Sequence, residues 1–226
     1  MSLLLKHYPR LENLLKQRCF YLLLSLMALL LASAFLSGTQ QGRVFTGIAN
    51  LVILLTAIAA VQQSRASLIV AGSLGAVAII VFIEALLLES TAHLVLAWAC
   101  GAVFYAYSLV HLLKYVLSHE ELSVDKLYGA VAAYVMLGIM WAFVHGVVQY
   151  FYPGAYSVNG NVTVLGMQDL LYFSFVILLT VGFGDILPML PPSRMLMVIE
   201  GITGTMYVAI LIARLTGIYP QTEEEK

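Results

Sequence analysis

The chain of 226 residues is 62% hydrophobic and only 10% charged, and its formal net charge is −1. Soluble domains are typically about 45–50% apolar and about 25% charged, so a water-soluble fold could not bury this much apolar surface. We therefore expect an all-α membrane protein embedded in a lipid bilayer, and the lack of a basic cluster argues against a nucleic-acid partner. Cys19 and Cys100 lie in apolar runs and indicate neither a disulfide nor a metal site.

Six apolar runs are long enough to cross a bilayer, which requires roughly 20 residues. They are Cys19–Ser37, Val44–Val61, Ala66–Leu88, Thr91–Leu117, Leu127–Phe151 and Met195–Tyr219. Met167–Leu179 is also apolar but too short to cross, and runs of this length are typical of re-entrant or buried helices. The sequence thus predicts six transmembrane helices, with one half-crossing helix before the last.

The basic residues are divided unevenly between the predicted loops. A cytoplasmic N-terminus leaves only Arg43 and Arg194 outside. The nine remaining basic residues then lie on the cytoplasmic side: Lys6, Arg10, Lys16, Arg18, Arg65, Lys114, Lys126, Arg214 and Lys226. Because cytoplasmic loops carry an excess of Lys and Arg, we expect both termini in the cytoplasm and a multi-pass protein of the plasma membrane, or of the inner membrane if the source is bacterial. The first run also resembles a signal-peptide core, an interpretation that the long charged segment before it disfavours.

One stretch, LLTVGFGDILP (Leu178–Pro188), does not fit a membrane helix, because it combines two glycines with a carboxylate. Non-helical backbone at membrane depth is tolerated only where it is buried in protein or lines a water-filled cavity. Carbonyl groups aimed at one axis can bind a dehydrated cation, and Gly182 and Gly184 allow backbone angles that residues with a Cβ resist. Thr180 adds a hydroxyl oxygen at one end of the row.

The hexapeptide TVGFGD (Thr180–Asp185), which follows a short apolar helix and precedes a full span, resembles the selectivity filter of the potassium channel superfamily, commonly TVGYGD. The resemblance covers residues 127–219 and suggests a six-span, prokaryotic-type member. It implies K⁺ coordination by the carbonyl groups of Thr180, Val181, Gly182 and Phe183, with Gly184 and Asp185 shaping the outer mouth. It also implies a homotetramer, because the chain contains a single filter segment, and neither enzymatic activity nor a cofactor apart from the bound K⁺.

The filter segment departs from the family pattern at Phe183, which lacks the hydroxyl group of the usual tyrosine. Tyr172 and Phe173 stand where many members of the family carry two tryptophans. These differences leave the strictness of K⁺ over Na⁺ selection open. The alternatives to a potassium channel are therefore a nonselective cation channel and a non-conducting or regulatory homologue.

Glu200 lies within the last predicted span, and an intramembrane carboxylate is a functional candidate by default. It could support the filter from behind through Ser174 or Tyr172, line the ion cavity, or only join two helices. For the first two roles, we expect Glu200→Gln to change conductance or inactivation. Gly204, four residues further on, matches by position the hinge glycine of the family, and close helix packing together with Gly201 is the alternative.

The sequence suggests an interfacial segment (1–18), a four-helix domain (19–118), a linker (119–126), a pore domain (127–219) and a short tail (220–226). Within the pore domain we expect a pore helix at 167–179, the filter at 180–185 and an inner helix at 195–219. The fourth span contains no Arg, and its one Lys lies near its end, so a voltage sensor of the usual kind is excluded. The predicted function is passive K⁺ conduction without steep voltage gating, with His93, His111 or His145 as candidate pH sensors and an unidentified regulatory subunit as a possible partner.

Overall fold

The structure is a computed structural model, and it describes residues 17–35, 53, 56, 65–88, 90–118 and 123–217. These residues are mostly helical, which confirms the helical part of the predicted fold. The helices are α3 (Arg18–Phe35), α5 (Arg65–Leu88), α6 (Thr91–Val116), α7 (Val124–Phe151), α8 (Met167–Leu178) and α9 (Pro191–Gly217). Three short strands accompany them: β1 (Tyr156–Val158), β2 (Asn161–Val162) and β3 (Ile186–Pro188).

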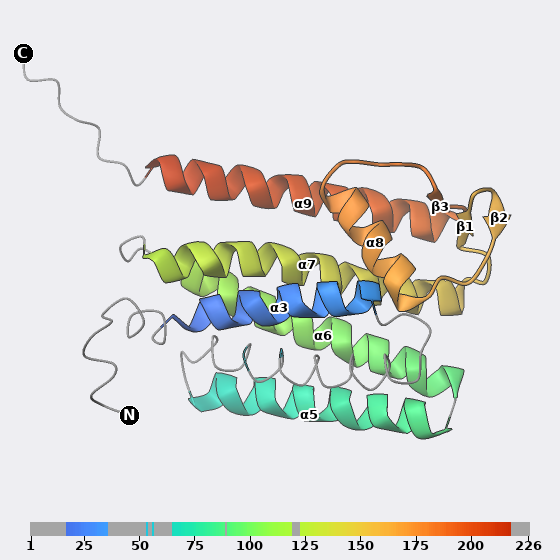
Figure 1. The fold of residues 1–226 in the computed structure, drawn as a ribbon, viewed down its shortest axis with the longest axis horizontal. Coiled ribbons are helices and arrows are strands. Elements are labelled where there is room, and N and C mark those ends of the chain that lie inside the picture. Colours follow the sequence, from blue (N-terminus) through green and yellow to red (C-terminus); the bar gives the residue numbers. More distant parts are fainter. Residues whose placement is uncertain are drawn as a thin grey trace, which may run out of the picture.

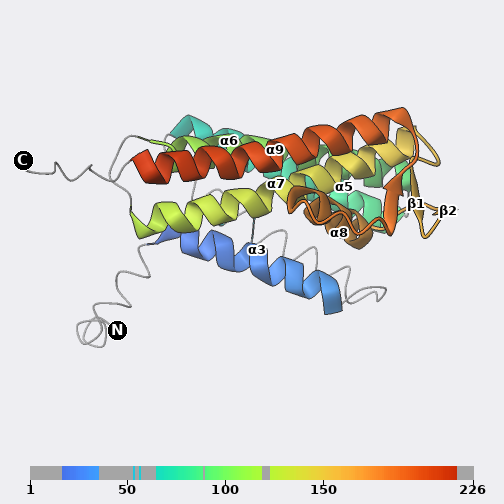
Figure 2. The same ribbon diagram turned by 90° about the horizontal axis from the view of Figure 1, so that it is seen from above.

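Helix α7 is the centre of the molecule. Figure 1 shows α9, α7, α6 and α5 stacked in that order, and Figure 2 shows α3 beside α7. Helix α7 contacts α3, α6, α8 and α9, and it is rich in buried small residues that let these neighbours approach closely. Examples are Ala132, Ala133 and Ala142, whose side chains are fully buried. The elements that follow α7 in the chain are therefore positioned mainly against this one helix.

Three of the described helices are long and apolar enough to cross a membrane: Thr91–Val116, Val124–Phe151 and Pro191–Arg214. They correspond to the fourth, fifth and sixth predicted spans. Within α3 and α5, the apolar stretches whose residues the structure describes throughout are shorter, Arg18–Leu31 and Ile69–Ala85. Apart from Ile53 and Thr56, which are helical, the second predicted span lies outside the described residues. The total of six spans stays a prediction.

The small sheet at one end of the molecule is a feature that the all-α prediction missed. Its order is β2-β1-β3 with antiparallel pairing, and Val158 pairs with both Asn161 and Ile186. Asn159 and Gly160, at φ +49° and +84°, form the turn between β1 and β2. Asn-Gly is the dipeptide that tight hairpin turns favour, because both central residues need positive φ. The sheet fastens the segment before α8 to the segment after it.

Two helices begin three or four residues earlier than their apolar runs. Helix α7 begins at Val124, where Ser123 caps it by accepting the N–H of Lys126, and not at Leu127. Helix α9 begins at Pro191 and not at Met195. Proline suits the first turn of a helix, since its fixed φ is helical and its missing N–H would be unpaired there anyway. Polar or proline-rich first turns are invisible to a search for apolar runs.

We predict that Gly146→Ala destabilises the contact between α6 and α7. An added Cβ at Gly146 would lie 2.7 Å from Trp98 Cε3, so the indole ring would have to move. Overpacking of this kind typically costs about 1–3 kcal/mol of unfolding free energy. The measurement is thermal unfolding of the purified protein in detergent.

The matched control is Gly72→Ala on α5, where an added Cβ meets no atom of the described residues within 4 Å. In that open position the substitution removes only a glycine from a helix interior, which is stabilising by about 0.5–1 kcal/mol. Equal melting temperatures for the two variants would contradict the packing argument.

Candidate functional site

Helix α8 directs the predicted filter segment to the middle of the long helices. It starts near the sheet and slants across α7 and α9, as Figure 1 shows. Its last residue, Leu178, lies against Gly204 near the middle of α9 and accepts a 2.7 Å hydrogen bond from the Tyr134 hydroxyl of α7. The segment that follows therefore starts halfway along the helices and returns to the sheet at β3.

The start of α8 is held by two polar contacts. The side-chain amide of Gln149 donates to the Leu165 carbonyl and accepts from the Leu165 N–H, both at 2.9 Å. At the first turn, the Asp169 carboxylate accepts the N–H of Gly166 at 3.1 Å. A negative charge at this end of a helix is favourable because the exposed N–H groups there carry partial positive charge.

The backbone of the filter segment alternates in conformation. Thr180, Gly182 and Gly184 have φ of +57°, +59° and +77°, whereas Val181 and Phe183 do not have positive φ. Alternation between left-handed and right-handed backbone brings successive carbonyl groups to the same side of the chain. Positive φ at Thr180 is unusual, since a β-branched residue resists this region, and such strain of about 1–3 kcal/mol concentrates at functional sites.

The carbonyl groups of Thr180 to Phe183 have no hydrogen-bond donor among the described residues. The N–H groups of Thr180 and Val181 donate back to Ile177 and Val176 at the end of α8, at 2.9 Å and 3.0 Å. Within the part of the chain that the structure describes, no hydrogen bond ends on the carbonyls of residues 180–183. All five residues from Thr180 to Gly184 are exposed in the single chain. The segment thus presents a row of free carbonyl oxygens, which are suitable ligands for a cation.

The outer end of the segment is tied to the sheet. The Asn159 N–H donates to the Asp185 carbonyl at 2.9 Å, and β3 follows directly. The Phe183 side chain is 70% exposed, and Tyr172 on α8 is also exposed. Neither ring is packed into the core of the chain.

Behind α8 lies a buried polar network that joins four elements. The Glu200 carboxyl of α9 contacts His145 Nε2 of α7 at 2.7 Å and the Ser174 hydroxyl of α8 at 2.5 Å. His145 Nδ1 contacts the Tyr156 hydroxyl of β1 at 2.6 Å, and Ser174 also contacts the Gly138 carbonyl of α7 at 2.8 Å. His145, Ser174 and Glu200 are fully buried. Burial raises the pKa of the Tyr156 phenol, so this hydroxyl keeps its proton.

The structure brings some of the sequence candidates together and separates others. Glu200 and Ser174 are in contact, whereas Tyr172 is not part of the network. The Glu200 side chain has 0% exposure even in the single chain, which favours support through Ser174 over the cavity-lining role; both roles stay predictions. His145 as a partner of Glu200 was missed, although both are ionisable residues deep within predicted spans. An intramembrane ionisable residue needs a partner, and that rule could have suggested the pair.

Gly204 lies at a close approach between α9 and the foot of the filter segment. An added Cβ would lie 2.7 Å from Leu178 Cδ2 and 3.1 Å from the Leu178 carbonyl oxygen. Helix α9 is continuous through this position. The contact supplies a packing reason for glycine here, and the hinge role stays a prediction.

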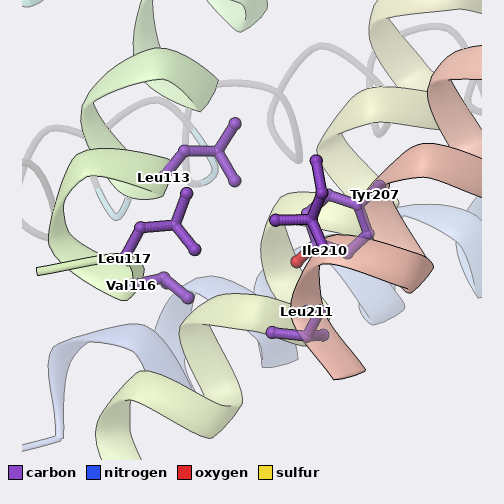
Figure 3. A pocket seen from close by; sticks show the side chains of 6 residues that line it. All are labelled: Leu113, Val116, Leu117, Tyr207, Ile210 and Leu211. Atoms are coloured by element: carbon purple, nitrogen blue, oxygen red, sulfur yellow. The ribbon is translucent and has the colours of Figure 1, made fainter. Parts of the chain in front are cut away.

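The part of α9 that follows Gly204 faces α6 across an apolar pocket of about 90 Å³ (Figure 3). One side is lined by Leu113 and Val116 of α6 and by Leu117 directly after it. Tyr207, Ile210 and Leu211 of α9 line the other. Beyond the pocket, the Arg214 guanidinium donates to the Ser118 carbonyl, which joins the end of α9 to the end of α6.

Comparison with known proteins identifies the part of the chain that contains the site. Residues 136–219 match the sequence profile of a protein family described as "Ion channel". The matched residues include most of α7, all of α8, the filter segment and α9. No curated protein matches the chain. No solved structure matches it either.

We predict that Gly204→Ala displaces the foot of the filter segment and lowers stability by about 1–3 kcal/mol, because backbone atoms of Leu178 cannot move aside as a flexible side chain can. Gly201→Ala is the matched control on the same helix, since its added Cβ would lie 3.8 Å from the nearest atom, Ile177 Cγ2. Thermal unfolding of both variants is the measurement. A melting temperature for Gly204→Ala at or above that of Gly201→Ala would show that the close approach is relaxed in solution.

Proposed function

Because residues 136–219 match an ion-channel family, we propose that the chain is a member of the pore-loop ion channel superfamily and the subunit of a potassium-selective channel. Four copies would surround one axis, and the carbonyl groups of Thr180, Val181, Gly182 and Phe183 would replace the hydration shell of K⁺. Gly184 and Asp185 would form the outer mouth. The channel would conduct passively across a plasma membrane, with both termini in the cytoplasm.

The observation that carries this proposal is the row of free carbonyl oxygens. Three alternate residues, Thr180, Gly182 and Gly184, have positive φ, and the carbonyls between them lack donors within the described chain. A polar backbone group left unpaired in lipid costs several kcal/mol, so these groups need cations, water or protein as partners. K⁺ held by carbonyl oxygens satisfies that need.

The uncovered face of α9 supports the tetramer. Its exposed apolar side chains include Met195, Val198, Ile199, Ile202 and Met206. Figure 1 shows α9 and the loop between α8 and β3 on the side of the molecule away from α5. Neighbouring copies arranged around a common axis would cover both features, and one segment per chain supplies only a quarter of a closed ring of ligands.

Two features bear on selectivity and gating. Phe183 has no hydroxyl with which to brace the filter, so a nonselective cation channel is the second candidate. Helix α6, in the position of a voltage sensor, contains Lys114 as its single basic Lys or Arg residue. Steep voltage dependence needs about 3–4 gating charges per subunit, so we propose a channel that voltage does not steeply gate.

The experiment is a flux assay on the purified full chain in liposomes. We expect K⁺ efflux that Ba²⁺ blocks, with much slower Na⁺ flux. Equal Na⁺ and K⁺ flux would identify a nonselective channel instead. No flux from folded, tetrameric protein would favour the non-conducting, regulatory homologue.

We predict that Gly182→Ala abolishes selective flux, while Gly160→Ala in the β1–β2 turn does not. Both glycines have positive φ, +59° and +84°, and an added Cβ meets nothing within 4 Å at either one. The two substitutions therefore introduce a similar backbone strain of roughly 1–2 kcal/mol. Only the first would turn carbonyl groups away from the ions, so similar flux from the two variants would contradict the coordination scheme.

A further inference from the structure

The buried network behind α8 contains more contacts than an ion pair would need. Its four contacts join Tyr156 to His145, His145 to Glu200, Glu200 to Ser174, and Ser174 to the Gly138 carbonyl. Each contact is between 2.5 Å and 2.8 Å long, so each should contain one proton. Each charge state of His145 and Glu200 supplies a different number of protons in different places, so the charge state can be tested by asking whether every contact receives one proton.

An ion pair between protonated His145 and ionised Glu200 does not satisfy these contacts. Both ring nitrogens would donate, so His145 Nδ1 would donate to the Tyr156 oxygen, and the Tyr156 proton would need another acceptor. Within the described residues, the Tyr156 hydroxyl contacts only His145. Ser174 has one proton for two acceptors, Glu200 and the Gly138 carbonyl, so one of its contacts would also be empty.

Ionised Glu200 beside neutral His145 is worse. Three protons would then serve four contacts, and a net negative charge would be buried with no cation nearby. Among the described residues, no Lys or Arg side chain contacts the pair; α7 offers His145, β1 offers Tyr156, and α8 offers only the Ser174 hydroxyl. An uncompensated charge at a site with 0% exposure is strongly unfavourable, because neither water nor a partner replaces its hydration shell.

One arrangement gives every contact a single proton. Tyr156 donates to His145 Nδ1, His145 Nε2–H donates to Glu200 Oε2, the Glu200 carboxylic acid donates from Oε1 to Ser174, and Ser174 donates to the Gly138 carbonyl. The four protons then point in one direction along the chain of groups, and such chains strengthen their members cooperatively. No group in it carries a net charge.

We propose that Glu200 is an uncharged carboxylic acid, and that it positions α8 by completing a one-directional chain of four hydrogen bonds from Tyr156 to the Gly138 carbonyl. These four hydrogen bonds together fasten α8, the helix before the filter segment, to α7, α9 and the sheet. Glu200 acts through Ser174 and is a positioning residue that does not touch the ions. Its effect on flux rests on the proposed channel function, whereas its protonation state does not.

Glu200→Gln is the variant that separates a neutral acid from an ion pair. A glutamine amide accepts through its oxygen and donates through its nitrogen, so it can keep both the His145 and the Ser174 contacts. Position alone suggested that Glu200→Gln would change conductance, but the proton count reverses that expectation. We expect this variant to fold, to assemble and to conduct as the unmodified protein does.

Glu200→Ala removes both the acceptor and the donor oxygen of the carboxyl group, so His145 Nε2–H loses its acceptor and the Ser174 oxygen loses its donor. We expect it to lower the melting temperature by roughly 5–10 °C and to lose flux. A Glu200→Gln protein as unstable as Glu200→Ala would overturn the proposal, because an ion pair would lose its charge balance in both variants.

The protonation state of Glu200 is measured by infrared spectroscopy on the full chain in liposomes at neutral pH. The spectrum of each variant is subtracted from that of the unmodified protein. We expect the unmodified protein to show the C=O stretching band of a hydrogen-bonded carboxylic acid, at higher frequency than carboxylate bands. The band should be absent from Glu200→Gln and present in Glu84→Gln, which makes the same change at an exposed carboxyl group of α5. A missing acid band in the unmodified protein would overturn the proposal even if flux is observed. An acid band without flux would leave the proposal standing and contradict the channel function alone.

Discussion

An unpaired backbone carbonyl has few acceptable surroundings in a membrane, and this constraint organises the second half of the chain. The carbonyl oxygens of residues 180–183 accept no hydrogen bond from the described part of the chain, so the segment needs a rigid frame on one side and partners for those oxygens on the other. The frame is present in a single chain. Leu178, at the foot, lies against α9 and bonds to Tyr134, and Asp185, at the outer end, is tied to the β1–β2 turn.

A single stripe along α7 supplies most of this frame. Tyr134, Gly138, Trp141, His145 and Gln149 follow one another at intervals of four, three, four and four residues, so they lie on one face of the helix. Side chains and backbone groups on that face contact the end of α8, the middle of α8, α9, the buried network and Leu165, two residues before α8. The close ring contact at Gly138, where an added Cβ would lie 2.6 Å from Phe175, belongs to the same stripe. Contacts from this one face of α7 therefore fix the position of α8 along α7 and its inclination to it.

The elements that the sequence predicted well are those set by apolar length. Met167–Leu179 was expected as a half-crossing helix and α8 is Met167–Leu178, because its apolar run begins after a glycine and ends at the filter segment. The strands were missed because two or three residues show no usable periodicity, and only Asn159-Gly160 signalled a hairpin. The buried network was also missed. His145 and Glu200 are 55 residues apart, and no local pattern records that two such side chains meet.

The uncharged state of the network has a consequence for ion binding in the proposed channel. A buried carboxylate beside the filter would act on a nearby cation through a medium of low dielectric constant, where unit charges interact far more strongly than in water. Its negative charge would add to the attraction that the carbonyl groups around the axis exert on K⁺, and would slow the release of the ions. Conduction requires that ions bind favourably but weakly enough to leave the filter. A neutral acid keeps the mechanical connection to Ser174 and removes this bias. Phe183 lacks the hydroxyl that braces the filter in related sequences, and a brace of hydrogen bonds behind α8 offers support without adding charge to the ion pathway.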